Sequence, residues 1–199
     1  MFFGLIRAHP RPRYVPDWPF PAYQHEPDIT PHPYREPRGH SFGQEEPTVE
    51  RLDPADPFSS TAYLFGFDLF NHGYFWEAHV WWEALWQAEG RKGDVADVLK
   101  ALIRLGAAGV KGRAGVNGGL VSHCGGAADL LDSVRERSGQ RWLMGIDLKE
   151  LAHHARSVAK GAPKRGRHPD LQGDRFAWSL RPGDPKGRGT VDPRSGVAE

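Results

Sequence analysis

The chain has 199 residues, a length suited to one domain with a buried core and terminal extensions. Its 26 basic and 25 acidic side chains give a net charge of +1, so no overall field favours nucleic acid or an anionic membrane as a partner. The single cysteine, Cys124, excludes an intrachain disulfide and a cysteine-based zinc cluster. The apolar start MFFGLI is shorter than the hydrophobic region of a signal peptide, and no apolar run reaches the length of a membrane span. These features predict a soluble cytoplasmic protein.

Proline divides the chain into three parts. Twelve of the 17 prolines lie between Pro10 and Pro57, and none lies between Phe58 and Ala162. Because proline disrupts helices, residues 1–57 are expected to form an extended arm and residues 58–160 a helical domain. The arm carries aromatic side chains that a solvated linker would lack, which favours an arm laid over the helical core: Trp18, Phe20, Tyr23, Tyr34 and Phe42.

Five helices are predicted inside the proline-free part. Ser59, Ser60 and Thr61 are candidate N-caps for the first helix, and His72 with Gly73 marks its end. Apolar periodicity then predicts helices over residues 61–71, 74–87, 94–112, 119–137 and 146–160. The third helix has small residues, such as Gly106 and Gly109, that allow another backbone to approach closely. The expected architecture is an all-α compact bundle of about five helices with a proline-rich N-terminal arm.

Residues 161–199 are expected to form a flexible basic tail, since they are rich in glycine, proline and arginine. The stretch DRFAWSLRP inside this tail has three apolar side chains, Phe176, Trp178 and Leu180, through which it could dock onto the domain.

The stretch FNHGYFWEAHVWWEALW, residues 70–86, concentrates the unusual chemistry of the chain. On the second helix His79 and Glu83 are four residues apart and therefore share one edge, beside a broad apolar face of the same helix. Glu77 points in another direction. Such a helix is expected to lie centrally in the bundle.

This stretch, the following ALIRLGAA helix and the GG-containing fourth helix resemble the bacterial and archaeal family called domain of unknown function 309. The resemblance extends from about Ala62 to Val134, and the arm segment PHPYREPRGHSFG resembles an extension found in some members. It implies an all-helical fold and no established activity. Two departures weaken a metal site, because Val80 replaces a frequent carboxylate and the cations Lys100 and Arg104 replace frequent glutamines.

A divalent metal is one hypothesis for the polar cluster. Imidazole and carboxylate are good ligands for zinc, iron or manganese, and His79 and Glu83 are spaced to reach one ion. Two ligands are too few, so His72, Glu77, or His32 and His40 from the arm would have to complete the shell. The His-Glu-x-x-His pattern of zinc proteases is absent from the sequence.

Two other interpretations stay open at this stage. In the structural one, His79 and Glu83 hydrogen-bond to each other, to Arg104 or to loop backbone and fix the packing of the second and third helices. In the enzymatic one, His79 is a general base oriented by Glu83. The sequence has no obvious nucleophile, phosphate loop or dinucleotide fingerprint, so whether the protein is an enzyme is left uncertain.

The preferred hypothesis is a pocket that binds a small polar ligand or a metal ion, because ionisable groups gather on otherwise apolar helices. Its expected ligand-binding residues are Asn71, His72, Glu77, His79, Glu83, Trp86 and Arg104, with Trp76, Trp82 and Trp86 as walls. The alternative is a protein-interaction module whose polar cluster is structural. A small-molecule or protein partner and a homo-oligomer are compatible with the sequence, whereas the dilute basic tail gives no strong nucleic-acid signal.

Overall fold

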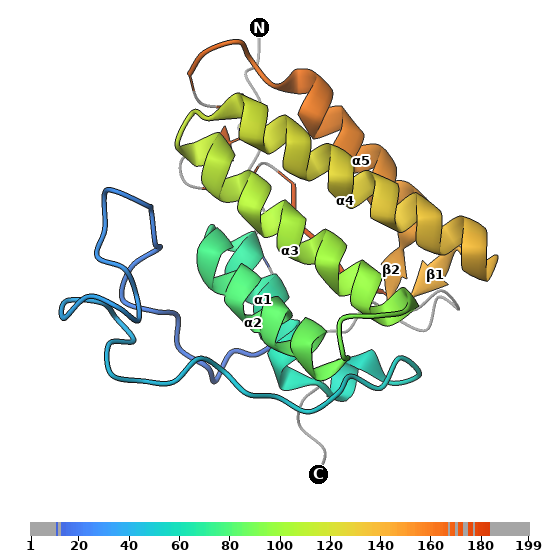
Figure 1. The fold of residues 1–199 in the computed structure, drawn as a ribbon, viewed down its shortest axis with the longest axis horizontal. Coiled ribbons are helices and arrows are strands. Elements are labelled where there is room, and N and C mark those ends of the chain that lie inside the picture. Colours follow the sequence, from blue (N-terminus) through green and yellow to red (C-terminus); the bar gives the residue numbers. More distant parts are fainter. Residues whose placement is uncertain are drawn as a thin grey trace, which may run out of the picture.

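The computed structural model describes residues 11, 13–166, 168–169, 171–172, 175–176 and 178–183. Over these residues the protein is all-α, as predicted, with five helices that stack in chain order (Figure 1). They are α1 (Thr61–Asn71), α2 (Phe75–Ala88), α3 (Asp94–Arg113), α4 (Asn117–Ser138) and α5 (Leu148–Gly161), preceded by the short 3-10 helix η1 (Pro57–Ser59). Within these described ranges, no helix has the length and apolar character needed to cross a lipid bilayer.

Helix α1 begins at a side-chain N-cap and ends at a glycine turn. The Ser60 hydroxyl accepts the backbone N–H of Tyr63, and Gly73, with φ of 89°, allows the chain to reverse into α2. Every residue from Ala62 to Asn71 is buried, because α1 is covered by its neighbours on all sides. A Cβ at Gly66 would overlap the indole of Trp82, so glycine at this position lets α2 pack closely against α1.

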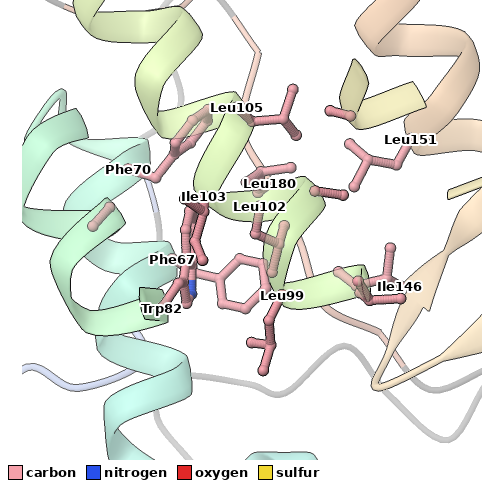
Figure 2. Close-up of a cluster of buried hydrophobic side chains, with 14 of the residues drawn as sticks. Phe67, Phe70, Trp82, Leu99, Leu102, Ile103, Leu105, Ile146, Leu151 and Leu180 are labelled. Carbon is pink, nitrogen blue, oxygen red and sulfur yellow. The ribbon is translucent and has the colours of Figure 1, made fainter. Parts of the chain in front are cut away.

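The same argument applies between α2 and α3. An added Cβ would lie 2.9 Å from the Phe75 carbonyl oxygen at Gly106, and 2.5 Å from the Phe75 ring at Gly109. The small residues of α3 therefore admit the start of α2 at close range. Figure 2 shows the core that results, in which aromatic side chains of α1 and α2 meet the leucines of α3 and apolar residues from the C-terminal third: Phe67, Phe70, Trp82, Leu99, Leu102, Leu105, Ile146, Leu151 and Leu180.

The fifth helix starts two residues later than predicted, because Ile146 and Asp147 belong to a small hairpin. Strand β1 (Trp142–Leu143) pairs antiparallel with β2 (Ile146–Asp147), and Met144 and Gly145 form the loop with φ of 54° and 74°. Positive φ at both loop positions matches the twist of a two-residue hairpin. Asp147 then caps α5, since its side chain accepts the backbone N–H of Glu150.

The chain beyond α5 contributes to the core. A second strand pair, β3 (Leu171–Gln172) with β4 (Arg175–Phe176), brings Phe176 against Phe70 and Phe75 at ring-centroid distances of 6.0 and 5.2 Å. Phe176 and Leu180 are buried and Trp178 is half-buried, so DRFAWSLRP docks through the three side chains expected. The hydrophobic core thus extends past Lys160, while the predicted flexibility of residues 184–199 concerns a part of the chain outside the described residues.

The structure describes Arg11 and residues 13–57 of the arm. These residues run along α1 and α2 (Figure 1). Trp18 lies 5.1 Å from Phe65 and 5.3 Å from Trp81 between ring centroids, and Phe20 stacks on Tyr74 at 4.9 Å. Phe42 differs from the expectation, because its side chain is exposed. Aromatic packing therefore attaches the first half of the arm, and other contacts must hold the rest.

Candidate functional site

Three carboxylates, one in α1, one in α2 and one at the C-cap of α2, attach the arm to the domain. All three side chains are almost fully buried and each accepts backbone N–H groups from the arm at 2.7–2.8 Å: Asp68 from Tyr14 and Val15, Glu77 from His25, and Glu89 from Leu52. Hydrogen bonds to a charged acceptor are roughly twice as strong as neutral ones. The arm is thus held at its beginning, middle and end, and it forms the outer wall of two hollows beside α2.

Asn71 and His72 hold chain segments together. Asn71 is fully buried; its Nδ2 donates to the Leu180 carbonyl at 2.9 Å, and its Oδ1 accepts the Leu180 N–H at 2.7 Å. His72 caps α1, with Nδ1 2.8 Å from the Asp68 carbonyl oxygen, and its own carbonyl accepts Gln24 Nε2 at 3.0 Å. Both residues were predicted to bind ligand, and the structure places them in contacts within the protein.

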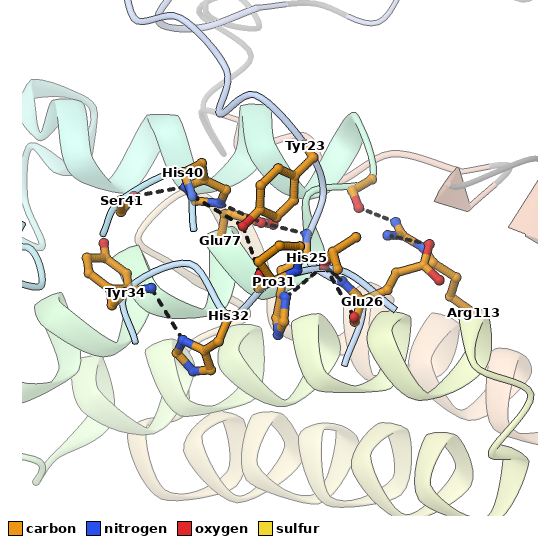
Figure 3. A network of polar contacts seen from close by, with 12 residues as sticks. Tyr23, His25, Glu26, Pro31, His32, Tyr34, His40, Ser41, Glu77 and Arg113 are labelled. Carbon is orange, nitrogen blue, oxygen red and sulfur yellow. Dashed lines mark hydrogen bonds and ion pairs between the residues drawn. The ribbon is translucent and has the colours of Figure 1, made fainter. Parts of the chain in front are cut away.

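Glu77 faces the arm (Figure 3). One carboxylate oxygen, Oε1, accepts the His25 N–H at 2.7 Å and lies 3.2 Å from His40 Nε2. Because Glu77 and His79 are two residues apart, they leave α2 in nearly opposite directions. The structure therefore separates Glu77 from the pair with which it was grouped.

His79 and Glu83 form the predicted pair on the edge of α2. His79 Nε2 lies 2.9 Å from Glu83 Oε2, and the side chains keep 31% and 40% of their surface exposed. They line a hollow of about 210 Å³, here called the His79 hollow, whose other walls come from Trp76 and Gln87 of α2 and residues 46–48 of the arm. A dissolved molecule can therefore reach both side chains.

The three tryptophans predicted as walls have different surroundings. Trp76 lines the His79 hollow and its ring packs against His25 and His32 of the arm. Trp82 is fully buried between α1 and α2, with Nε1 donating to the Tyr63 carbonyl at 3.4 Å, so it forms core and no wall of the hollow. Trp86 does not line the His79 hollow; the Lys100 ammonium lies 3.9 Å from its ring centroid.

Arg104 lies on the α3 and α4 side of the bundle. Its guanidinium packs where a Cβ of Gly126 would stand, and its buried Nε has no hydrogen-bond partner among the described residues. His123 is close by: burial lowers its pKa, and the charges of Arg104, Lys111 and His79 lower it further. The buried Nδ1 of His123 also has no hydrogen-bond partner in the described part of the chain. Arg104 thus lies outside the lining of the His79 hollow, and its charge acts on His123.

The residues do not fit the metal hypothesis well. Within the described ranges, no group of three or more His, Cys, Asp or Glu side chains is arranged to hold an ion. His72 caps α1, and Glu77 with His40 is bonded on the other side of α2, so neither completes a shell around His79 and Glu83. Two protein ligands are fewer than zinc, iron or manganese sites require.

The arm residues of the His79 hollow, Glu46, Pro47 and Thr48, were not found from the sequence. They have no periodic pattern and are about 30 residues from α2 along the chain, so only their tertiary position reveals them. Another hollow of about 260 Å³ lies between α5 and the C-terminal segment, with Trp142 and His154 among its walls. It contains none of the predicted site residues.

The fold and this site define a helical domain whose second helix presents ionisable side chains to an overlying arm. Residues 63–122 match the family model described as Domain of unknown function (DUF309), so this segment of the chain is similar to that family. The match covers α1, α2, α3 and the start of α4, including every predicted ligand-binding residue. Comparison with curated proteins found no match, and comparison with solved structures found none either.

Proposed function

We propose that this domain binds a small polar ligand in the His79 hollow. The observation that carries the proposal is the His79 and Glu83 pair itself, which is held at 2.9 Å and open to a hollow with other polar walls. The wall groups Glu46, Thr48 and Gln87 add a carboxylate, a hydroxyl and an amide. Two carboxylates in one hollow favour a ligand rich in hydrogen-bond donors, such as a polyol or an amide.

Energetics favour a binding role for this pair over a structural one. An exposed i, i+4 ion pair contributes only about 0.3–0.5 kcal/mol, because water screens it and ordering two side chains costs entropy. A pair that is 31% and 40% exposed belongs to this class. Its removal is expected to change stability little and ligand binding strongly.

The test compares matched histidine variants. Thermal shift and ligand-observed NMR with a panel of polyols and amides should find probes that bind the wild type and are lost in His79→Ala and Glu83→Gln. His153→Ala removes an exposed histidine of α5 and should leave binding intact. A probe that binds His79→Ala as well as the wild type would reject this site.

The second candidate is a protein-interaction module whose polar cluster is structural. It is favoured by the bonds of Asn71 and Glu77, which hold other segments of the chain, and by the exposed Ile29 and Phe42 on the arm. This alternative expects His79→Ala to lose at least about 2 kcal/mol of stability, as when a buried network is broken. Urea unfolding of the variant therefore distinguishes the two candidates.

A metal ion is tested directly by inductively coupled plasma mass spectrometry of untagged protein. With two protein ligands at His79 and Glu83, we expect no stoichiometric zinc, iron or manganese. A stoichiometric metal that disappears in His79→Ala would overturn this expectation.

A further inference from the structure

A larger hollow lies on the other side of Trp76 and Val80, between the arm, α1 and α2. Its volume is about 360 Å³, and we call it the aromatic cavity because five Phe, Tyr and Trp side chains line it. The side chains that matter for the argument are Phe20, Tyr34, Phe65, Trp76, Trp81 and the carboxylate of Glu77. Aromatic walls around a carboxylate combine apolar surface with negative charge.

Glu77 has unused hydrogen-bonding capacity in this cavity. The side chain is 4% exposed, and its Oε1 accepts the contacts of His25 and His40 described above. The other oxygen, Oε2, is buried and has no hydrogen-bond partner among the described residues. A buried carboxylate oxygen without a partner is costly, so a ligand that brings a positive charge or a hydrogen-bond donor close to Glu77 would be stabilising.

No lysine or arginine in the described part of the chain forms an ion pair with Glu77. Its ion-pair contact is with His40, whose Nε2 lies 3.2 Å from Glu77 Oε1 and whose Nδ1 lies 2.9 Å from the Ser41 hydroxyl oxygen. Burial lowers the pKa of His25, which is therefore neutral at pH 7. Burial raises the pKa of Tyr34, and the charge of Glu77 contributes to the increase. Among the described residues that line the cavity, Glu77 is the acidic group and none is a lysine or arginine.

We propose that the aromatic cavity binds a small organic cation with an alkylated ammonium group. The ammonium charge complements Glu77, and the faces of Trp76 and Trp81 attract cations through their quadrupoles. Alkyl groups on the nitrogen suit apolar walls better than a hydrated inorganic ion, whereas an anion would be repelled by Glu77. The site is separate from the His79 hollow and does not depend on the function proposed there.

The experiment measures binding of choline and of its uncharged carbon isostere, dimethylbutanol, to the full chain by isothermal titration calorimetry. We expect saturable choline binding and isostere affinity weaker by roughly tenfold or more, since only choline has the charge. Glu77→Gln keeps an acceptor for the His25 N–H but removes the charge, and should weaken choline binding by a similar factor while leaving the isostere unchanged. His79→Ala should bind choline normally.

Tryptophan variants provide an independent readout that does not touch the arm bond of Glu77. Trp81→Leu should weaken choline binding, whereas Trp142→Leu, which alters the hollow beside α5, should not. Equal affinity for choline and its isostere, or no saturable choline binding at millimolar concentration, would overturn the proposal. Should Glu77→Gln fail to fold, the isostere comparison and the two tryptophan variants still decide.

Discussion

Asn71→Ala is expected to release the C-terminal segment from the core. The substitution removes both hydrogen bonds to Leu180, of 2.9 and 2.7 Å, in a place where water cannot replace them. Each bond contributes about 1 kcal/mol net, and the Leu180 N–H and C=O left unpaired add to the cost, so we expect a loss of about 2–4 kcal/mol. The melting temperature should fall by roughly 5–12 °C for a chain of this size.

The assay is urea unfolding followed by circular dichroism, together with hydrogen exchange of residues 178–183. Asn117→Ala is the matched control, because Asn117 is also buried but its side chain makes one bond to the described residues, from Nδ2 to the Gly166 carbonyl at 2.9 Å. It should cost about 1 kcal/mol. If Asn71→Ala loses no more stability than the control and residues 178–183 stay protected from exchange, the two Asn71 bonds do not hold the C-terminal segment. Asn71 then becomes a ligand candidate again.

Three further predictions follow from packing and burial. Gly66→Ala should destabilise the domain by about 1–3 kcal/mol, because the added Cβ overlaps Trp82. Gly125→Ala has open space at its Cβ and should stabilise α4 by up to about 1 kcal/mol. The urea midpoints of the two variants measure these effects, and equal midpoints would contradict the packing argument. Burial lowers the folded-state pKa of His25 below its ordinary 6.5, so the unfolded chain binds the proton more tightly and stability should fall as pH drops below 6.5. Urea unfolding at pH 7 and pH 5 measures this loss of unfolding free energy, which should be smaller in His25→Gln than in the wild type. An equal loss in both proteins would refute the assignment to His25. Burial raises the pKa of the Cys124 thiol to about 12, so Ellman's reagent should react only as the protein unfolds, and fast labelling of the native protein would show that the thiol is accessible.

The attachment of the arm gives the polar residues of α1 and α2 two kinds of role. Asp68 and Glu89 accept arm N–H groups and line none of the three hollows described above. Glu77 does both, because one of its oxygens holds the arm and the other is unused beside the aromatic cavity. A carboxylate in this region therefore indicates ligand binding only where a hollow and an unfilled bonding position coincide.

The sequence by itself determined the helices. The absence of proline between Phe58 and Ala162, the Ser60 cap and Gly73 act within a few residues, and such local signals set the bounds of α1 and the position of the bundle. Periodicity also placed His79 beside Glu83, since a helical turn fixes that spacing whatever surrounds it.

Only the tertiary structure decided what each face of α2 meets. Helical periodicity gives the angle between Trp82, Glu77 and His79, but it does not say that one enters the core, one meets the arm and one lines a hollow. The path of the arm depends on bonds across 37 to 54 positions, such as Tyr14 to Asp68 and Leu52 to Glu89. Contacts at such separations leave no periodic trace in the chain, and the two hollows of α2 exist because the arm closes them.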